Sequence, residues 1–453
     1  MSSMRARLAD PRSPIRTQWA RLRHRVETRL TPVMETWSDP RLDGKLRLLR
    51  HAPLVPERLQ RFKAPRPWPV PSREVPDELR GVPGIERDPA AEQAAFGERP
   101  FHHFVDVHSE AGEYAVKNGW EYIIASAPRL LRAKKRVTKV AHDAPRKAEE
   151  SADPKALTEL IRSRARELNI SAVGFAPHDP RYTFAPYAHQ QEPSVMVVVV
   201  EQDHAATQTA PSVRAERAAF RAYAEGDEKA ADLAAFVQGL GFRARPHGYL
   251  GEGVVISYAV QAGLGQLGLN GQLLTPQAGS RARLGLISTN APVVHDEPVD
   301  FGVNKVCDAC QICVRRCPPG AIPITRKEFR GVVKAKIKPE RCFPILAQTH
   351  GCAVCMKVCP VQKWGLDAVR DHLAKTGEIP GKGSSELEGY RWPLDGRFYG
   401  PGEKPKITKQ LLEPPGWKFD KTRTAPLDPS KVRASLIKRP DGGILGPNDQ
   451  TVV

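Results

Sequence analysis

The sequence predicts an α/β (α+β) core followed by a small cysteine-rich module on its C-terminal side. Apolar patterns typical of helices and of strands alternate between residues 154 and 299, which favours this mixed class. All eight cysteines of the 453-residue chain then lie between residues 307 and 359. No apolar run approaches the roughly 18 to 20 residues that cross a bilayer, so we expect no transmembrane segment.

We expect four regions along the chain. Residues 1–153 form a basic N-terminal arm and linker, and residues 154–299 form an α/β core able to bind a cofactor. Residues 300–365 form the cysteine-rich module, and residues 366–453 form a C-terminal helix with an extension rich in proline and glycine. The 42 prolines place much of the first and last regions in arms and loops.

The N-terminal region is strongly basic. Residues 1–70 hold 16 Lys and Arg against 6 Asp and Glu, a surplus of ten within the net charge of +18. Residues 17–30 and 129–140 have the pattern of basic helices. Such charge would suit nucleic acid or an anionic membrane surface, but a solvated basic tail is the commoner outcome. The first residues lack the apolar stretch of a secretory signal, so we expect a cytoplasmic protein.

The core should begin with a helix, because Asp153-Pro154 offers an N-cap and a proline in the first turn. Strands are predicted over residues 170–176 and 195–200. A pair of alanine-rich helices should cover residues 211–239 with a break at Gly226, and a short strand should span residues 242–245. The apolar stripe of the first helix consists of Leu157, Leu160, Ile161, Ala165 and Leu168.

A glycine-rich loop follows the next predicted helix, residues 254–262, and leads into a strand over residues 284–290. Its start, Gly263-x-Gly265-x-x-Gly268, fits the dinucleotide-binding fingerprint. That fingerprint must follow a strand and open a helix, and here the order is reversed, so we exclude a Rossmann site. A loop of this kind still lets backbone amides approach a ligand closely.

The cysteines indicate a ferredoxin-like module with two [4Fe-4S] clusters. Their first half reads C-x2-C-x2-C-x3-C-P, which is the spacing of bacterial two-cluster ferredoxins. In that arrangement the fourth cysteine of each run binds the other cluster. Structural zinc sites usually pair two C-x2-C units without the third cysteine, and disulfides suit short secreted domains. The expected ligands are Cys307, Cys310, Cys313 and Cys359 for one cluster, and Cys317, Cys342, Cys352 and Cys355 for the other.

The glycine-rich loop and the cysteine run together resemble the corrinoid-dependent reductive dehalogenases and their relative, epoxyqueuosine reductase. The resemblance covers residues 155–365 and rests on Ala262-Gly-Leu-Gly265, Asn270-Gly271, Leu274-Thr-Pro276, Gly279 and Arg283 ahead of the cysteines. It implies a nitroreductase-like core that binds cobalamin in its base-off form. The cofactor-binding residues that it implies are Gly263, Gly265, Asn270, Gly271, Thr275 and Gly279.

The sequence departs from the dehalogenases at one residue and from the epoxyqueuosine reductases in one cysteine interval. Many dehalogenases have a basic residue immediately before the Asn-Gly pair, whereas this chain has Leu269, which puts their substrate handling in question here. Epoxyqueuosine reductases have a longer interval within the second cysteine run. The short interval between Cys342 and Cys352 resembles the dehalogenases instead.

The leading hypothesis is an iron-sulfur oxidoreductase that reduces a small organic substrate, with reductive dehalogenation among its candidate reactions. Electrons would come from a donor such as a ferredoxin, a flavodoxin or a reductase, and would pass through the clusters to the corrinoid. Tyr249 and Tyr182 are the candidate proton donors, although tyrosines more often serve in packing. The alternatives are a ferredoxin-like electron carrier and a tRNA-modifying reductase similar to epoxyqueuosine reductase.

Overall fold

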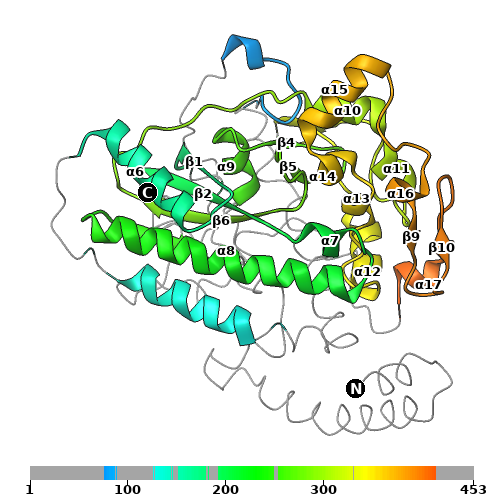
Figure 1. The fold of residues 1–453 in the computed structure, drawn as a ribbon, viewed down its shortest axis with the longest axis horizontal. Coiled ribbons are helices and arrows are strands. Elements are labelled where there is room, and N and C mark those ends of the chain that lie inside the picture. Colours follow the sequence, from blue (N-terminus) through cyan, green and yellow to red (C-terminus); the bar gives the residue numbers. More distant parts are fainter. Residues whose placement is uncertain are drawn as a thin grey trace, which may run out of the picture.

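A computed structural model describes residues 76–86, 88, 126, 128–143, 145, 152–179, 182, 192–248, 254–329 and 331–414. Its centre is a four-stranded sheet with helices on both faces, and the cysteine-bearing helices gather at one end of it (Figure 1). Among these residues, no helix combines the length and the apolar character needed to cross a membrane. The predicted basic helix at residues 17–30 lies outside the described residues.

The sheet has the order β1-β2-β6-β3, and every neighbouring pair is antiparallel. β2 (Ser194–Glu201) lies between β1 (Ala172–Pro177) and β6 (Ala282–Thr289), and β3 (Ala244–His247) pairs with the far side of β6. All of β2 except its last residue is buried, because helices cover both faces of the sheet. The mixed class predicted from the sequence is confirmed, with an antiparallel sheet.

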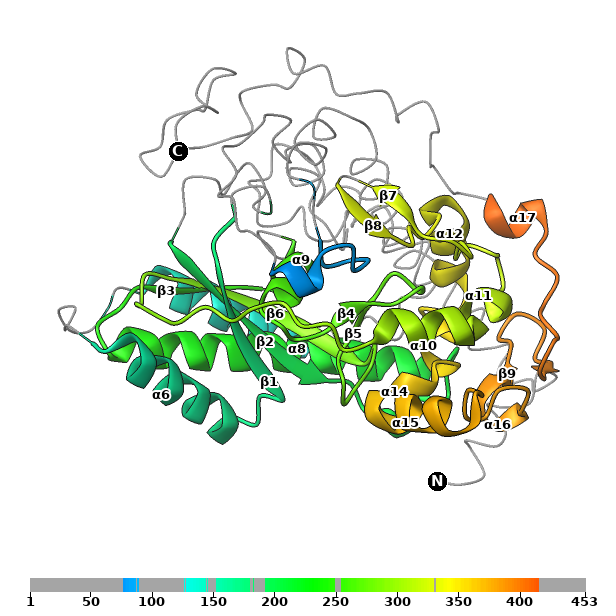
Figure 2. The same ribbon diagram turned by 90° about the horizontal axis from the view of Figure 1, so that it is seen from above.

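Two apolar cores cover the two faces of this sheet. On one face, α6 (Pro154–Glu167) and α8 (Val213–Gly239) pack with the helical residues 128–142. On the other face, α9 (Val255–Gln261) packs against alternate residues of β2. Figure 2 shows α6 and α8 on one side of the sheet and α9 on the other. The predicted helix at residues 129–140 is therefore confirmed, and it belongs to the main core.

The first helix of the core starts where the sequence predicts. The Asp153 carboxylate accepts a hydrogen bond from the Ala156 amide at 2.7 Å, as an N-cap residue should. The predicted apolar stripe is wrong at Leu160, which is 47% exposed, whereas Leu157 and Ile161 are buried. The buried face is narrow because only the side of α6 that carries Leu157, Ile161 and Ala165 meets the sheet.

The predicted break at Gly226 is also wrong, because α8 is a single helix of 27 residues. A glycine in a helix interior costs roughly 1 kcal/mol relative to alanine, which burial of one face of this long helix offsets. Gly226 lies where α8 crosses β6 closely. A Cβ on Gly285 of β6 would stand 3.6 Å from the Gly226 carbonyl oxygen and 2.8 Å from a methyl group of Val198.

The glycine-rich loop forms a small hairpin between the core and the cysteine module. Its strands are β4 (Gln266–Leu267) and β5 (Leu273–Leu274). The Gln266 side-chain oxygen accepts hydrogen bonds from the amides of Phe301 and Val303, at 2.6 and 3.3 Å, at the start of α10 (Val303–Cys310). Leu274 belongs to the apolar core of the cysteine module. The hairpin therefore joins the two parts of the molecule.

The cysteine module and the residues after it share one apolar core, which includes Val306, Val358, Tyr390 and Trp392. The helix predicted at residues 364–373 is present as the end of α14 (Pro360–Trp364) and most of α15 (Leu366–Thr376), separated by Gly365. The remaining elements are η1 (Asp77–Leu79), α7 (His204–Thr207), α11 (Ile312–Arg316), β7 (Lys327–Phe329), β8 (Val332–Lys334), α12 (Pro339–Gln348), α13 (Val354–Lys357), α14 (Pro360–Trp364), α15 (Leu366–Thr376), α16 (Ser385–Glu388), β9 (Tyr390–Arg391), β10 (Phe398–Tyr399) and α17 (Lys409–Leu412).

Candidate metal centre

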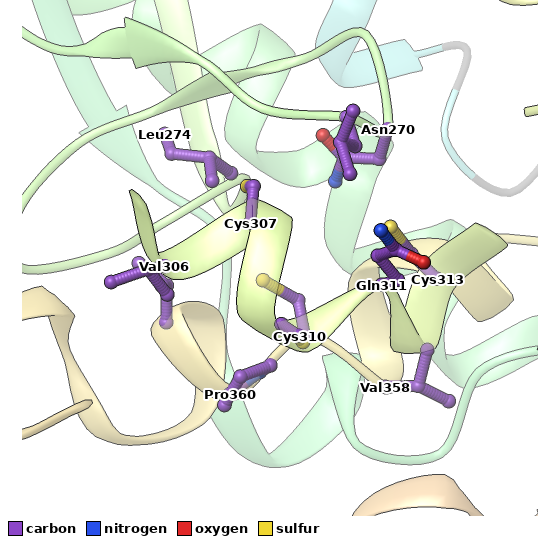
Figure 3. Close-up of a pocket in the computed structure, with 12 residues that line it drawn as sticks. Asn270, Leu274, Val306, Cys307, Cys310, Gln311, Cys313, Val358 and Pro360 are labelled. Carbon is purple, nitrogen blue, oxygen red and sulfur yellow. The ribbon is translucent and has the colours of Figure 1, made fainter. Parts of the chain in front are cut away.

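Four cysteines from three segments of the chain line one pocket (Figure 3). Cys307 and Cys310 come from α10, Cys313 comes from α11, and Cys359 immediately precedes α14. The other residues lining the pocket are Leu269, Asn270, Leu274, Val306, Gln311, Val358, Pro360 and Val361. The first expected ligand set thus surrounds a single space, and the glycine-rich loop forms part of its wall.

The backbone turns sharply at equivalent places in the two cysteine runs. Gln311 has a φ of 51° and separates α10 from α11, so that Cys310 and Cys313 lie on either side of a tight turn. Ala353 has a φ of 57° and occupies the same place between Cys352 and Cys355. Residues other than glycine adopt this left-handed conformation at a cost of roughly 1 to 2 kcal/mol. Such strain is typical of functional sites.

The other four cysteines gather in a second place. Burial raises the pKa of Cys342 well above its usual range, and the nearby thiols of Cys352, Cys355 and Cys317 raise it further. Burial also raises the pKa of Cys352 to about 12, with an additional contribution from Cys317. Of the first set, Cys313 and Cys359 also interact with Cys355. The two groups are therefore neighbours.

Buried thiols of this kind need a positive charge before they can ionise. Burial raises the pKa of Cys310 to about 11 and that of Cys359 to about 12, so both are neutral thiols at neutral pH unless metal displaces the protons. No three His, Cys, Asp or Glu side chains in the described ranges converge closely enough to hold a single metal ion. A [4Fe-4S] cube is larger and binds thiolates that stand apart around it, which fits both groups.

Backbone amides donate hydrogen bonds to the cysteine sulfurs. The Ala321 amide lies 3.2 Å from the Cys317 sulfur, and the amides of Gln362 and Val361 lower the pKa of Cys359 against the larger effect of burial. The Leu269 amide, from the glycine-rich loop, does the same for Cys307. Hydrogen bonds of this type help to set the reduction potentials of iron-sulfur clusters. The Leu269 amide therefore joins the glycine-rich loop directly to Cys307.

The glycines of the predicted corrinoid loop lie against the protein's own chain. A Cβ on Gly263 would stand 2.5 Å from the Glu297 carbonyl oxygen, and one on Gly265 would stand 2.5 Å from the Leu274 carbonyl oxygen. Gly279 has a φ of +52°, and its Cβ would lie 2.7 Å from the backbone of Gln362, just after Cys359. These glycines thus allow the loop to pack closely on the core and on the cysteine module.

The polar residues of the predicted set also shape the loop. Asn270 is buried and accepts a hydrogen bond from the Gln272 amide at 3.2 Å. Thr275 accepts one from the Ala278 amide at 3.2 Å, and a Cβ on Gly271 would meet Ile337 at 2.9 Å. A direct role for these residues in binding a corrinoid stays a prediction.

Three polar atoms on the same stretch are buried without a hydrogen-bond partner among the described residues. They are Gln266 Nε2, Gln272 Oε1 and Ser280 Oγ. Buried polar groups are nearly always paired in proteins, so these atoms are suited to a bound group that carries both donors and acceptors. Nothing in their sequence context distinguishes them from surface residues.

The structure places one of the two predicted proton donors. Tyr182 is 4% exposed, and its ring lies edge-on to Tyr258 with 5.3 Å between the ring centroids. The Tyr258 hydroxyl donates to the Asp179 carbonyl oxygen at 2.9 Å. Tyr249 lies outside the described residues. Catalytic roles for Tyr182 and Tyr249 stay predictions.

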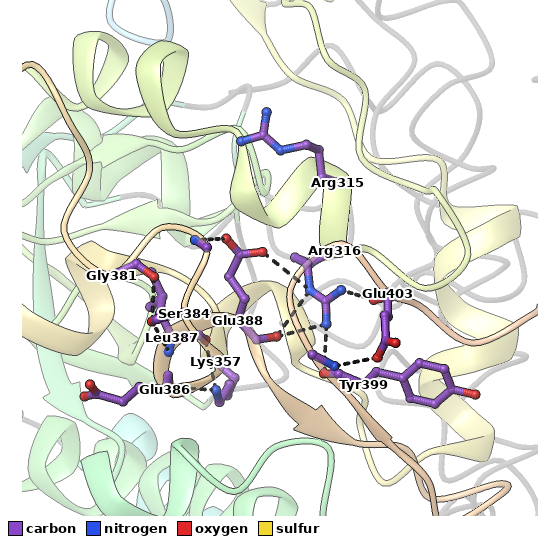
Figure 4. A network of polar contacts seen from close by, with 12 residues as sticks. Arg315, Arg316, Lys357, Gly381, Ser384, Glu386, Leu387, Glu388, Tyr399 and Glu403 are labelled. Atoms are coloured by element: carbon purple, nitrogen blue, oxygen red, sulfur yellow. Dashed lines mark hydrogen bonds and ion pairs between the residues drawn. The ribbon is translucent and has the colours of Figure 1, made fainter.

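A buried arginine beside the cysteines is not predicted by the sequence. Arg316 is 2% exposed and donates to the carbonyl oxygens of Glu388, Tyr399 and Glu403, while its Nε lies 3.8 Å from the Glu388 carboxylate (Figure 4). It immediately precedes Cys317. Its neighbour Arg315 has the same side chain and, within the described ranges, makes one hydrogen bond, to the Cys310 carbonyl oxygen. Only the fold distinguishes the two arginines.

Known proteins resemble both the module and the core. A family model described as a 4Fe-4S dicluster domain matches residues 306–363. A tetrachloroethene reductive dehalogenase of Desulfitobacterium hafniense is 32% identical over 217 residues, which cover 44% of this chain and 39% of that protein. One from Sulfurospirillum multivorans is 34% identical over 143 residues, 30% of this chain and 28% of the relative. An epoxyqueuosine reductase of Lactococcus garvieae is 31% identical over 126 residues, 24% and 32% of the two chains.

Solved structures extend the likeness to the fold. A catabolic reductive dehalogenase, NpRdhA, in complex with 3-bromo-4-hydroxybenzoic acid superposes with a TM-score of 0.55 at 20% identity, over 78% of this chain and 55% of the other. A second structure of that protein gives a TM-score of 0.50 at 23% identity, over 62% and 46%. The sequence matches span well under half the length of these curated relatives. The cysteine run, the loop that lines its pocket and these likenesses together make the chain similar to the reductive dehalogenases and epoxyqueuosine reductases.

Proposed function

We propose that this protein is a cytoplasmic reductase in which two [4Fe-4S] clusters serve a corrinoid that dehalogenates a small organic halide. The observation that carries the proposal is the shared wall of the first cysteine pocket. Leu269, Asn270 and Leu274 of the glycine-rich loop line the same space as four thiols. A module that only carried electrons to partners would not need this junction with a core of its own.

The proposed ligands are the two cysteine sets predicted from the spacing. The pocket supports Cys307, Cys310, Cys313 and Cys359 as one set. The mutual effects of Cys317, Cys342, Cys352 and Cys355 on their pKa values support the other. Each bound cluster would supply one-electron transfer. The cysteines would fix the positions of the two cubes, and burial would keep water away from them.

Electron paramagnetic resonance can test these ligand sets. Cys317→Ala should damage the cluster that also uses Cys342, Cys352 and Cys355, and Cys359→Ala should damage the other. Each variant should keep roughly half of the iron, because one complete set of four ligands remains. Loss of the same spectral component in both variants would refute the assignment.

The proposed corrinoid site lies along the glycine-rich loop of a nitroreductase-like core. Gln266, Gln272 and Ser280 carry the unpaired buried atoms that could bond to the amide groups at the edge of a corrinoid. Gly263, Gly265, Asn270, Gly271, Thr275 and Gly279 would hold the loop in shape around it. A bound corrinoid would supply a strongly reducing cobalt. One solved structure with this fold concerns B12-dependent dehalogenation.

A proton must reach the carbon from which a halide leaves, and a single positioned acid would deliver it with the least access for water. Tyr249 is the first proposed donor and Tyr182 the second. Tyr249→Phe removes only the hydroxyl, so turnover should fall by roughly 10² to 10⁴-fold while cluster and corrinoid content stay unchanged. Tyr182→Phe is the matched variant. If neither lowers turnover, both tyrosines have packing roles.

The proposed function is tested with protein purified anaerobically and reconstituted with iron, sulfide and cobalamin. We expect iron and cobalt to stay bound through gel filtration, and halide to be released from an organohalide panel when reduced methyl viologen is the donor. The panel should include tetrachloroethene, after which one similar protein is named, and 3-bromo-4-hydroxybenzoic acid, which is bound in one similar structure. Iron without cobalt and without halide release would favour an electron carrier, and retained flavin would favour a nitroreductase.

The match to epoxyqueuosine reductase supports a second candidate, a tRNA-modifying reductase. The net charge of +18 is compatible with it. Binding to tRNA that weakens steeply with salt, together with reduction of epoxyqueuosine in that tRNA, would favour this candidate. Halide release without such binding would exclude it. The physiological donor, whether ferredoxin, flavodoxin or reductase, would be identified by replacing methyl viologen with each.

A further inference from the structure

The hydroxyl of Tyr390, a residue of β9, is buried. The residue is 3% exposed, and its phenolic oxygen makes no hydrogen bond within the described part of the chain. Leaving such a group unpaired is unfavourable, because it has lost its hydrogen bonds to water. A buried tyrosine usually finds a partner for its hydroxyl, so a bound group is the natural candidate.

The ring of Tyr390 is held firmly in place. The Arg316 guanidinium lies 4.9 Å from the ring centroid, and Trp392 and Tyr399 flank the ring at centroid distances of 6.3 and 6.1 Å. Three backbone carbonyls fix Arg316 in turn (Figure 4). The hydroxyl therefore has little freedom to turn toward another partner.

The second cysteine set lies next to this ring. Arg316, whose guanidinium lies on the ring, directly precedes Cys317 in the chain. Cys352 packs against the apolar core that contains Tyr390, as do Cys307 and Cys313 of the first set. Burial raises the pKa of the Tyr390 hydroxyl; Arg316 lowers it, and Cys352 and Cys317 raise it further. The phenol thus lies within electrostatic reach of two ligands of one proposed cluster.

We propose that the Tyr390 hydroxyl donates a hydrogen bond to a sulfur of the cluster held by Cys317, Cys342, Cys352 and Cys355, and thereby raises the reduction potential of that cluster. The inference rests on the cluster binding proposed above. A cluster gains negative charge when it is reduced, so a donor to its sulfur stabilises the reduced form more than the oxidised form. Tyr390 lies beyond residues 306–363, the range that matches the dicluster family. A residue that follows the dicluster range would thus raise the reduction potential of a cluster bound within that range.

The test is a redox titration of the reconstituted protein, followed by electron paramagnetic resonance of each cluster. In Tyr390→Phe, the ratio of reduced to oxidised second cluster at a fixed solution potential should fall about tenfold. This corresponds to a reduction potential lower by about 59 mV for one electron. The first cluster should not change. Tyr399→Phe is the matched control, because its ring belongs to the same stack but its hydroxyl bonds to Asp395 at 2.7 Å.

The possible outcomes separate this inference from the proposed function. Two clusters in the wild type with unchanged potentials in Tyr390→Phe would overturn the role of Tyr390 alone. An equal shift in Tyr399→Phe would also overturn it, since it would reflect the ring stack. Loss of the second cluster in Tyr390→Phe would identify the hydroxyl as a structural support and not a tuning donor. A wild type that binds no cluster would refute the proposed function itself.

Discussion

Gly279→Ala should weaken the junction between the core and the cysteine module. Gly279 has a φ of +52°, and an added Cβ would stand 2.7 Å from both Cα and N of Gln362. The left-handed conformation costs an alanine roughly 1 to 2 kcal/mol. The contact involves backbone, which cannot rotate away, and overpacking of this kind costs roughly 1 to 3 kcal/mol more. We expect the free energy of unfolding to fall by about 2 to 5 kcal/mol.

Gly377→Ala provides a matched control, because Gly377 has a φ of +73° but an added Cβ would have no atom within 4 Å. It should lose only the conformational part, about 1 to 2 kcal/mol. The measurement is anaerobic urea unfolding of both reconstituted variants, with iron content as a second readout. Gln362 lies three residues after Cys359, so Gly279→Ala should also lose iron from the first cluster more readily. Equal stability losses in the two variants would refute the argument that Gly279 is required for close contact.

Three further predictions follow from buried groups. Arg316→Met should lower the free energy of unfolding by about 3 to 5 kcal/mol, because it leaves three carbonyls without their donor and removes the positive charge beside the buried Glu388 carboxylate. Arg315→Met should lower it by only about 1 kcal/mol, and equal losses would contradict the assignment. Burial raises the pKa of Glu216 from 4.5 to about 7, so the folded state binds this proton more tightly than the unfolded state does. Stability from Glu216 is therefore complete below about pH 4.5 and is lost as the pH rises toward 7. Glu216→Gln should remove roughly 3 kcal/mol of this pH dependence, and an unchanged dependence of the unfolding free energy on pH, measured with urea, would contradict it. In the iron-free folded protein, Cys310 should react with iodoacetamide roughly two orders of magnitude more slowly than a free cysteine at neutral pH, because burial raises its pKa to about 11. A rate like that of free cysteine would contradict its burial.

Local signals in the sequence predict much of the fold. Asp153-Pro154 marks the start of α6, and the apolar run of residues 195–200 becomes one of the two inner strands of the sheet. Leu160 and Gly226 show the limit of such signals. Whether an apolar residue at the edge of a helical stripe is buried depends on the width of the face that meets the sheet. Whether a glycine interrupts a helix depends on how much the rest of the helix buries.

The candidate site was predictable where the chemistry requires a fixed spacing. The two-residue intervals between cysteines reflect a turn at Gln311 and another at Ala353, so the sequence carries that geometry directly. Arg316 and Tyr390 carry no such signal, because the contacts of Arg316 with Glu388 and with the Tyr390 ring join residues more than 70 positions apart in the sequence. The unpaired atoms of Gln266, Gln272 and Ser280 likewise become visible only when burial is known.

The hydrogen bonds that Gln266 accepts at the start of α10 have a consequence for how proteins with this architecture can diversify. A side chain of the hairpin accepts hydrogen bonds from the amides of Phe301 and Val303, and Leu274 fills a place in the core around the cysteine helices. A chimaera that joined this sheet to the dicluster unit of another ferredoxin would lack both contacts unless the donor unit matched them. The two halves should therefore be inherited together, and recombination between relatives should succeed only where the crossover keeps the hairpin with the cysteine helices.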